Sequence, residues 1–267
     1  MNTQIDKQKI VSEIKKAADA YKKNLVGKTF LYVFEGQYIE VMFKTKDFKH
    51  LTGVDSKLSA QEFYKKAVKK ELQSSQVFFS ARHPYKLAQK KLKHLHAISS
   101  LVMGESFMLK DIKTQTETYK FGTTDLKFSL CFNKEYDNNG TEQGTCFIAK
   151  SLRDEDCFSK SSDAFTITHI FSKKNDEKKY NQEVYCEKGY TITELSPEIK
   201  SMLSADILGV LRQCAAVPNQ SQQSTVKRMT GYISRETLKK SSKELAEKRS
   251  KSPEHSAPKK KRDTSLE

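Results

Sequence analysis

The sequence lacks the motifs by which many enzymes hold a nucleotide or a metal. It contains no phosphate-binding P-loop, no glycine-rich dinucleotide fingerprint, no His-Glu-x-x-His pair and no serine-nucleophile elbow. No acidic cluster stands out as a magnesium site. We therefore expect neither a metal nor a cofactor, and any catalysis by this chain is expected to use acid/base chemistry.

Cysteines are few and long apolar runs are missing. The five cysteines are Cys131, Cys146, Cys157, Cys186 and Cys214. No Cys-x-x-Cys pair or Cys/His cluster has zinc-ligand spacing, so we expect small core side chains in a reducing cytoplasm. Residues 1–25 show no secretory signal, and no run approaches the roughly 18 apolar residues of a membrane span. We expect a cytoplasmic protein with no membrane contact.

Positive charge is what the sequence has in excess. It contains 48 Lys and Arg against 33 Asp and Glu, a formal net charge of +15. Such a surplus favours an anionic partner: nucleic acid first, with anionic lipid or an acidic protein as alternatives. Residues 218–267 hold 13 basic and 6 acidic residues but few apolar ones, which predicts a largely disordered basic tail. Its cluster Lys259, Lys260, Lys261 and Arg262 fits a polycation that contacts phosphates or, alternatively, a nuclear signal.

The spacing at which apolar residues recur changes along the chain. An amphipathic helix opens it, a hairpin follows over residues 29–44, and helices are predicted to begin at Ser59 and Pro84. After about residue 105 the period becomes 2, which predicts strands, and a helix follows Ser196. This order predicts an α+β fold, with N-terminal helices packed on a mostly antiparallel sheet, a C-terminal helix and the disordered basic tail. The expected boundaries are 1–28 (first helix), 29–190 (main α+β domain), 191–217 (C-terminal helix) and 218–267 (tail).

His50 is the first candidate for chemistry. Cleavage of RNA by its own 2′-hydroxyl needs a proton acceptor, a proton donor and cations for the phosphorane. Histidine can take either proton role, because its ordinary pKa lies near about 6.5. His50 is followed by Gly53, which permits a tight turn, and preceded by Lys49, which adds charge. A surface or core histidine without a catalytic role is the alternative.

Three other histidines have less informative positions. His94 and His96 lie among the lysines of a predicted helix, so we expect both to be solvated. His83 precedes Pro84, and we expect it to be a turn residue at the helix start.

Two basic strand ends are candidates for phosphate contacts. Lys150, Ser151 and Arg153 lie at the end of one predicted strand, where a hydroxyl and two cations could hold a phosphate. Lys174 lies at the end of another. An ordinary solvated strand end is the alternative interpretation of both.

A longer motif resembles a known family. The run Phe43-x4-Phe48-Lys49-His50-Leu51-Thr52-Gly53-Val54, with Phe63-Tyr64 on the next helix, resembles the fourth phage clade of the Barnase–EndoU–colicin E5/D–RelE-like nucleases. The resemblance covers roughly Thr29 to Glu187. It implies leading helices packed on an antiparallel sheet, metal-independent RNA cleavage, and a home on phages, plasmids or other mobile elements. It carries over His50, with Thr52 beside it.

Charge and resemblance together predict a metal-independent endoribonuclease of a phage or mobile element, with RNA as partner and an antitoxin or immunity protein as a second candidate partner. The expected catalytic residues are His50, Lys150, Ser151 and Arg153, of which the last three are chosen from position alone. The expected nucleic-acid contacts are Lys49, Thr52, Lys174, Lys259, Lys260, Lys261 and Arg262. Two alternatives stay open: a non-catalytic nucleic-acid-binding or accessory protein, and a protein-binding inhibitor.

Overall fold

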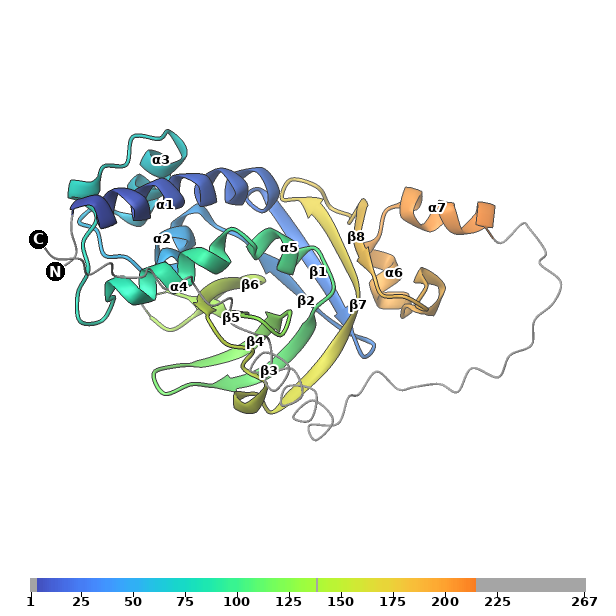
Figure 1. Ribbon diagram of the computed structural model, residues 1–267. Helices are drawn as coiled ribbons and strands as arrows, with labels where there is room; N and C mark the ends of the chain where they lie inside the picture. The colour runs from blue at the N-terminus through green and yellow to red at the C-terminus, as the bar shows by residue number, and fades with distance from the viewer. Residues whose placement is uncertain (1–3, 138, 215–267) are drawn as a thin grey trace, which may run out of the picture. The chain divides into compact units, whose positions relative to one another are not determined.

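The fold is known from a computed structural model that describes residues 4–137 and 139–214 (Figure 1). The helices are α1 (Gln4–Asn24), α2 (Phe48–Thr52), α3 (Ala60–Val68), α4 (Tyr85–Leu95), α5 (Ile98–Val102), α6 (Pro197–Met202) and α7 (Ala205–Cys214). The strands are β1 (Lys28–Phe34), β2 (Gln37–Met42), β3 (Phe107–Lys113), β4 (Thr118–Thr124), β5 (Ser129–Tyr136), β6 (Glu142–Arg153), β7 (Asp163–Lys174) and β8 (Gln182–Cys186).

Seven of these strands close into a barrel. Their order is β1-β2-β6-β5-β4-β3-β7, and β7 pairs again with β1. Every neighbouring pair is antiparallel except β2 and β6, which are parallel. β8 lies outside this ring and pairs with β7 beyond the end of the β3 pairing. The prediction of helices packed on an antiparallel sheet is therefore wrong, because pairing of β1 with β7 closes the sheet on itself.

Strand β1 is buried on both faces. Phe30, Tyr32 and Phe34 belong to the main core, whereas Leu31 and Val33 belong to a second apolar cluster. Such a strand has no polar side and hence no alternation along its sequence. Its hairpin with β2 was predictable from a local turn, but its partner β7 is more than a hundred residues away and left no local signal.

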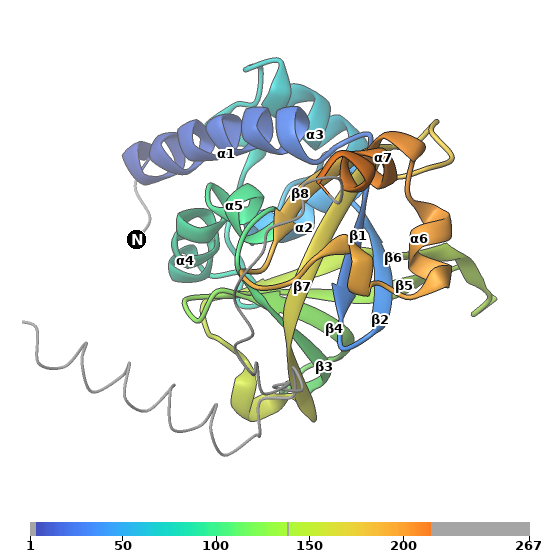
Figure 2. The same cartoon turned by 90° about the vertical axis from the view of Figure 1, so that its right-hand side faces the viewer.

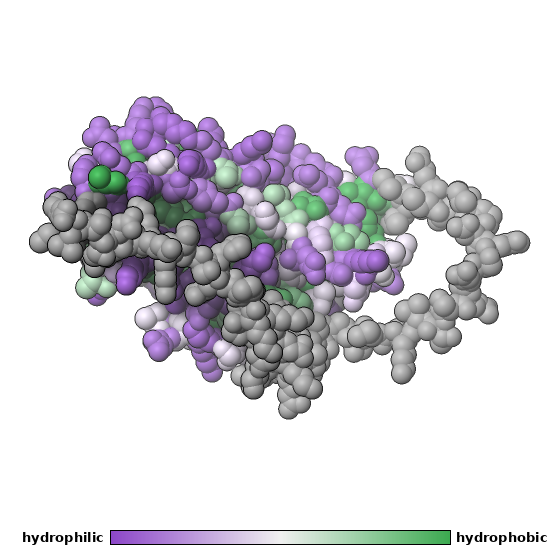
Figure 3. Space-filling view, viewed as in Figure 1, coloured by the Kyte–Doolittle hydropathy of each residue, from purple (hydrophilic) through white to green (hydrophobic). Residues whose placement is uncertain are grey.

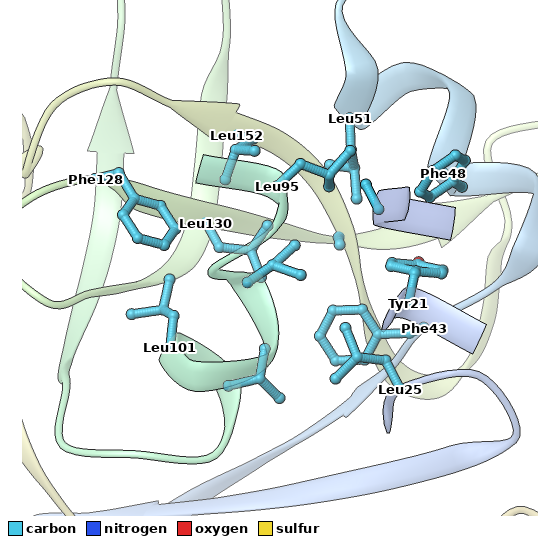
Figure 4. Close-up of a cluster of buried hydrophobic side chains, with 14 of the residues drawn as sticks. Tyr21, Leu25, Phe43, Phe48, Leu51, Leu95, Leu101, Phe128, Leu130 and Leu152 are labelled. Carbon is cyan, nitrogen blue, oxygen red and sulfur yellow. The ribbon is translucent and has the colours of Figure 1, made fainter. Parts of the chain in front are cut away.

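The main core connects the N-terminal helices to the strands (Figure 4). The Tyr21 ring of α1 packs against Phe43 and Phe48, with centroids 6.0 and 5.2 Å apart. Its hydroxyl donates a hydrogen bond of 3.2 Å to the carbonyl oxygen of Lys44. Phe48 and Leu51 are both fully buried, so α2 is held in place from its inner side. Large buried side chains of this kind each contribute roughly 2–3 kcal/mol through the apolar area they remove from water.

The second cluster lies outside β1 and β7. There Phe171 packs with Ile199 of α6 and Ile207 of α7. These two helices lie on the side of the strands that faces the viewer in Figure 2. Ser196 caps α6 by accepting a hydrogen bond of 3.3 Å from the backbone of Ile199. Ser59 caps α3 in the same way, at 3.2 Å. Both predicted helix starts are confirmed.

Helix α1 covers the core with one face only. Ile10, Ile14, Ala18 and Tyr21 are buried, while the surface over α1 and α3 is mainly hydrophilic (Figure 3). In the part of the chain that the structure describes, no helix is both long enough and apolar enough to cross a membrane.

Several local expectations are corrected or untested. The helix predicted to begin at Pro84 is α4, which ends at Leu95, and a separate short helix, α5, follows after His96 and Ala97. Cys131 and Cys157 are buried as expected, but Cys146 is half-buried and Cys186 is exposed. The domain boundaries stay predictions, and the tail, 218–267, lies outside the described residues.

Candidate active site

His50 lies on the outer side of α2. Its neighbours Phe48 and Leu51 point into the core, which leaves the imidazole exposed. Gly53 ends the helix with φ 71° and ψ 22°, the left-handed conformation that glycine adopts without steric cost. A Cβ at Gly53 would lie 2.8 Å from Cδ of Lys91. Glycine therefore both ends α2 and lets Lys91 of α4 approach it.

A cleft of about 500 Å³ opens beside His50. Its walls come from α2, the segment before α4, α4 itself, the start of β4 and the end of β6. The side chains with the most useful chemistry are His50, His83, Lys91, Tyr119, Ser151 and Arg153. The fold thus gathers groups from four separate stretches of sequence into one concave site.

A β-bulge turns Ser151 and Arg153 toward this cleft. Neighbouring residues of β5 pair with Ala149 and Ser151, so Lys150 between them has no partner. One extra residue reverses the alternation of a strand. Ala149 and Leu152 consequently both face the main core, whereas Ser151 and Arg153 both line the cleft.

Arg153 is held against Tyr119. Its Nη2 donates to the Tyr119 hydroxyl at 3.2 Å and to Oγ1 of Thr114 at 3.1 Å, and the guanidinium carbon lies 5.6 Å from the Tyr119 ring centroid. The Tyr119 hydroxyl donates in turn to Glu117 at 2.7 Å. Nε of Arg153 is buried and has no hydrogen-bond partner among the described residues. A buried donor without a partner is costly, so an anionic oxygen at this point would be favourable.

Lys91 is the second cation of the cleft. Its side chain is buried, and Nζ lies 3.5 Å from the carbonyl oxygen of His50. Burial, assisted by the charge of Arg153, lowers the pKa of Lys91 to about 8. Within residues 4–137 and 139–214, neither Lys91 nor Arg153 forms an ion pair with a carboxylate. An arriving phosphate would offset the cost of burying both charges.

The two histidines of the cleft have different surroundings. Nδ1 of His83 lies 2.7 Å from a carboxylate oxygen of Asp55, an arrangement that orients the ring. The pKa of His50 is lowered, first by partial desolvation and then by the ammonium of Lys91, with a smaller contribution from His83. The His50 imidazole is thus biased toward its neutral form, whereas the His83 imidazole is oriented by a carboxylate.

Two carboxylates at the rim of the cleft already have cationic partners. Asp154 contacts Nε2 of His94 and forms an ion pair of 3.0 Å with Lys90. Glu155 pairs with Lys160. Glu117, the third carboxylate of the lining, accepts from the neutral Tyr119 hydroxyl, so its charge acts on Lys91 and His50. The contact of Asp154 with His94 involves a buried histidine, so the expectation of a solvated His94 is wrong.

One known protein family matches more than half of the chain. Residues 13–189 match the family model described as phage-Barnase-EndoU-ColicinE5/D-RelE like nuclease4. The chain belongs to this nuclease family. The family resemblance predicted from the motif around His50 is confirmed. No curated protein and no solved structure matches the chain.

Two motif residues of this nuclease, Lys49 and Thr52, form hydrogen bonds that stabilise the fold around α2. Lys49 donates to the carbonyl oxygens of Ser56 and Leu58, at 2.9 and 2.7 Å, and thereby holds the loop after α2. Thr52 is fully buried, and its hydroxyl donates to the carbonyl oxygen of Lys49 at 2.6 Å. Neither side chain lines the cleft. Both therefore act on His50 indirectly, by fixing α2.

Three other groups of predicted residues lie outside the cleft lining. Lys150 is the bulged residue of β6, near enough that its charge contributes to the lowered pKa of His50. Lys174 is exposed at the last position of β7. The tail residues Lys259, Lys260, Lys261 and Arg262 lie outside the described part of the chain.

His83 and Lys91 were missed in the sequence. His83 stands 28 positions from Asp55 in the chain, and Lys91 is one of several lysines along α4. The only available signal for Lys91 was its position on the apolar side of that helix, which would have predicted burial.

A second groove adjoins the cleft at Tyr119. It has a volume of about 740 Å³ and runs over β3 to β6. Lys113, Lys120 and Lys134 line it, the last two in ion pairs with Asp111 and Glu142, together with Tyr136, which is 57% exposed. Lysines beside an exposed ring are typical of surfaces that bind single-stranded nucleic acid.

Proposed function

We propose that this nuclease cleaves RNA without a metal, by attack of the 2′-hydroxyl on the adjacent phosphate. The observation that carries the proposal is the lining of one cleft by two histidines and two partly or fully buried cations, Lys91 and Arg153, that pair with no carboxylate among the described residues. That set supplies every group the reaction requires. His50 and His83 move the protons, and Lys91 and Arg153 stabilise the phosphorane.

The proton roles follow from the surroundings of each imidazole. His50, with its lowered pKa, is neutral near pH 7 and takes the proton from the 2′-hydroxyl. His83, oriented by Asp55, donates a proton to the departing 5′-oxygen. The new bond joins the 2′-oxygen to phosphorus while the bond to the 5′-oxygen breaks. The products are a 2′,3′-cyclic phosphate and a 5′-hydroxyl.

Metal independence rests on the donor set of the cleft. Its carboxylates have partners: Glu117 accepts from Tyr119, Asp154 pairs with Lys90, and Glu155 pairs with Lys160. A magnesium site would need several oxygen ligands free of such contacts. Buried cations can instead supply the stabilisation of negative charge that a metal supplies elsewhere.

The RNA chain would extend from the cleft into the groove beyond Tyr119. Ser151, which lines the cleft, is placed to donate to a phosphate oxygen. Lys174 and the tail cluster remain proposed nucleic-acid contacts. Neutralising the tail cluster should flatten the slope of log affinity against log salt, since each phosphate contact releases counterions. The proposal also includes action in the cytoplasm on behalf of a phage or mobile element, controlled by an antitoxin or immunity protein.

The test uses full-length protein with total RNA and with single-stranded DNA, in EDTA, from pH 5 to 9. We expect RNA fragments that end in 2′,3′-cyclic phosphate, and intact DNA because it lacks the nucleophile. His96→Gln is the matched control, since His96 pairs with Glu13 away from the cleft. Intact RNA at every pH, with a folded protein, would contradict the proposal. RNA binding under those conditions would instead support a non-catalytic nucleic-acid-binding protein.

A further inference from the structure

Strands β7 and β8 bring three metal-ligand side chains together. His169, Glu183 and Cys186 each offer one ligand atom, and these atoms lie within 4.8 Å of one another. None of the three lines the cleft that contains His50. The cluster is therefore a separate feature that the proposed cleavage reaction does not use.

A β-bulge in β8 makes this grouping possible. Residues three apart on a regular strand point to opposite faces. Here Cys186 pairs with His169 and Glu183 pairs with Phe171, which leaves Val184 as an extra residue. The bulge thereby places Glu183 and Cys186 on one face of β8, beside His169.

The imidazole of His169 has an unsatisfied nitrogen. Its side chain is 1% exposed, and Nε2 has no hydrogen-bond partner among the described residues. The other nitrogen, Nδ1, lies 3.2 Å from Oγ1 of Thr168, and the ring stacks on Phe171 at 5.7 Å. Buried polar atoms nearly always have a partner. A ligand at Nε2 would supply the missing one.

The pKa values of the two other donors are both shifted upward. Burial raises the pKa of Glu183. Burial, followed by the charges of Glu183 and Glu187, raises the pKa of the Cys186 thiol, whose sulfur lies 3.4 Å from the carbonyl oxygen of Tyr190. A bound cation reverses this situation, because it favours the carboxylate and the thiolate.

We propose that Nε2 of His169, the Glu183 carboxylate and the Cys186 sulfur bind one Zn²⁺ ion. One imidazole, one thiolate and one carboxylate suit zinc, whereas magnesium and calcium require more oxygen ligands. Water completes the tetrahedron. On binding, the thiol gives up its proton to solvent as the sulfur–zinc bond forms.

Such an ion would join β8 to β7 by a link other than backbone pairing. β8 lies outside the closed barrel and pairs with β7 alone among the described strands. An ion that binds only the folded chain stabilises it by mass action. At free zinc about a hundred times Kd we expect the melting temperature to rise by roughly 5–10 °C.

The test is titration of chelator-treated full-length protein with Co²⁺, which reports a thiolate ligand through near-ultraviolet absorption, followed by displacement with Zn²⁺. We expect one Co²⁺ per chain with that absorption. Cys186→Ser should abolish it, and Glu183→Gln and His169→Gln should weaken binding on the order of tenfold or more, as loss of one ligand does. Cys146→Ser, at a half-buried cysteine of β6, is the matched control and should bind like the parent.

Three outcomes would overturn the proposal. The first is no Co²⁺ binding by the parent, and the second is equal binding by the Cys186→Ser and Cys146→Ser proteins. The third is loss of the absorption in Cys157→Ser but not in Cys186→Ser, which would assign the metal to the neighbouring Cys131 and Cys157. Glu183 is exposed, so its variant keeps the test informative even if His169→Gln fails to fold.

Discussion

The cleft and the β7–β8 cluster are two histidine sites of opposite character. In the cleft, His50 shares the lining with Lys91 and Arg153, and two of the three carboxylates there form ion pairs with other lysines. In the β7–β8 cluster, His169 lies beside Glu183 and Cys186. The histidine of the cleft therefore lies where an anion would be favourable, whereas His169 lies where a cation would be. The charge of the surrounding groups decides which ligand a histidine suits.

The two sites also differ in access. His50 is exposed, as a group that must meet a large substrate has to be. His169 is 1% exposed, which suits an ion held for stability. Both sites depend on a β-bulge, at Lys150 in β6 and at Val184 in β8. Bulges re-aim side chains next to functional sites: the one in β6 turns Ser151 and Arg153 away from the face of Ala149, and the one in β8 places Glu183 and Cys186 on one face.

The variant His50→Gln tests whether the cleft is the active site, and it has the largest expected effect. We expect turnover of RNA to fall by about 10²–10⁴-fold, the usual contribution of one acid/base group, with RNA affinity little changed. Single-turnover cleavage and equilibrium binding measure the two effects, with melting temperature as the check on folding. A variant that cleaves like the parent would remove His50 from the active site, and one that unfolds would make it a structural residue.

Lys91→Met tests the cations of the cleft. Methionine keeps the apolar stem but loses the charge, so cleavage should fall on the order of 10²-fold. The free energy of unfolding should rise by about 1–3 kcal/mol at pH 7, because the cost of burying an ammonium disappears. Denaturant unfolding measures the change in stability, and cleavage rates measure the change in activity. Lys93→Met, at an exposed position of α4, should change neither.

The pH dependence of cleavage should be bell-shaped. Activity requires neutral His50, so the lower limb should lie below the ordinary histidine pKa of 6.5. It also requires a proton on His83 and the charge of Lys91, so the rate should decline no later than the pKa of Lys91, about 8. Each limb changes the rate by about tenfold per pH unit. A profile whose upper limb is not displaced in Lys91→Met would show that another group controls it.

The smallest expected effect is that of Cys186→Ser on cleavage. Because Cys186 is no part of the cleft lining, we expect kcat/KM within about twofold of the parent at 25 °C, as for sites that share no partners. The same variant should lose the rise in melting temperature with zinc. A large loss of cleavage in the folded variant would show that the two sites are coupled.

Local patterns predicted parts of the cleft. Gly53 after His50 predicted a tight turn, and Gly53 does end α2 in the left-handed conformation. Ser151 and Arg153, chosen as a basic strand end, do line the cleft. Lys150 was chosen with them but does not, because the bulge at this residue depends on pairing with β5.

The sequence by itself determined the charge, the helix caps at Ser59 and Ser196, and the family to which the chain belongs, because these depend on composition and on residues close together in the chain. Only the tertiary structure decided that the strands close into a barrel, since this requires pairing of β1 with the distant β7. It also decided the partners of His83 and His169 and the direction in which each bulged strand points its side chains. Such contacts follow from chain topology and burial, which leave no periodic mark on the sequence.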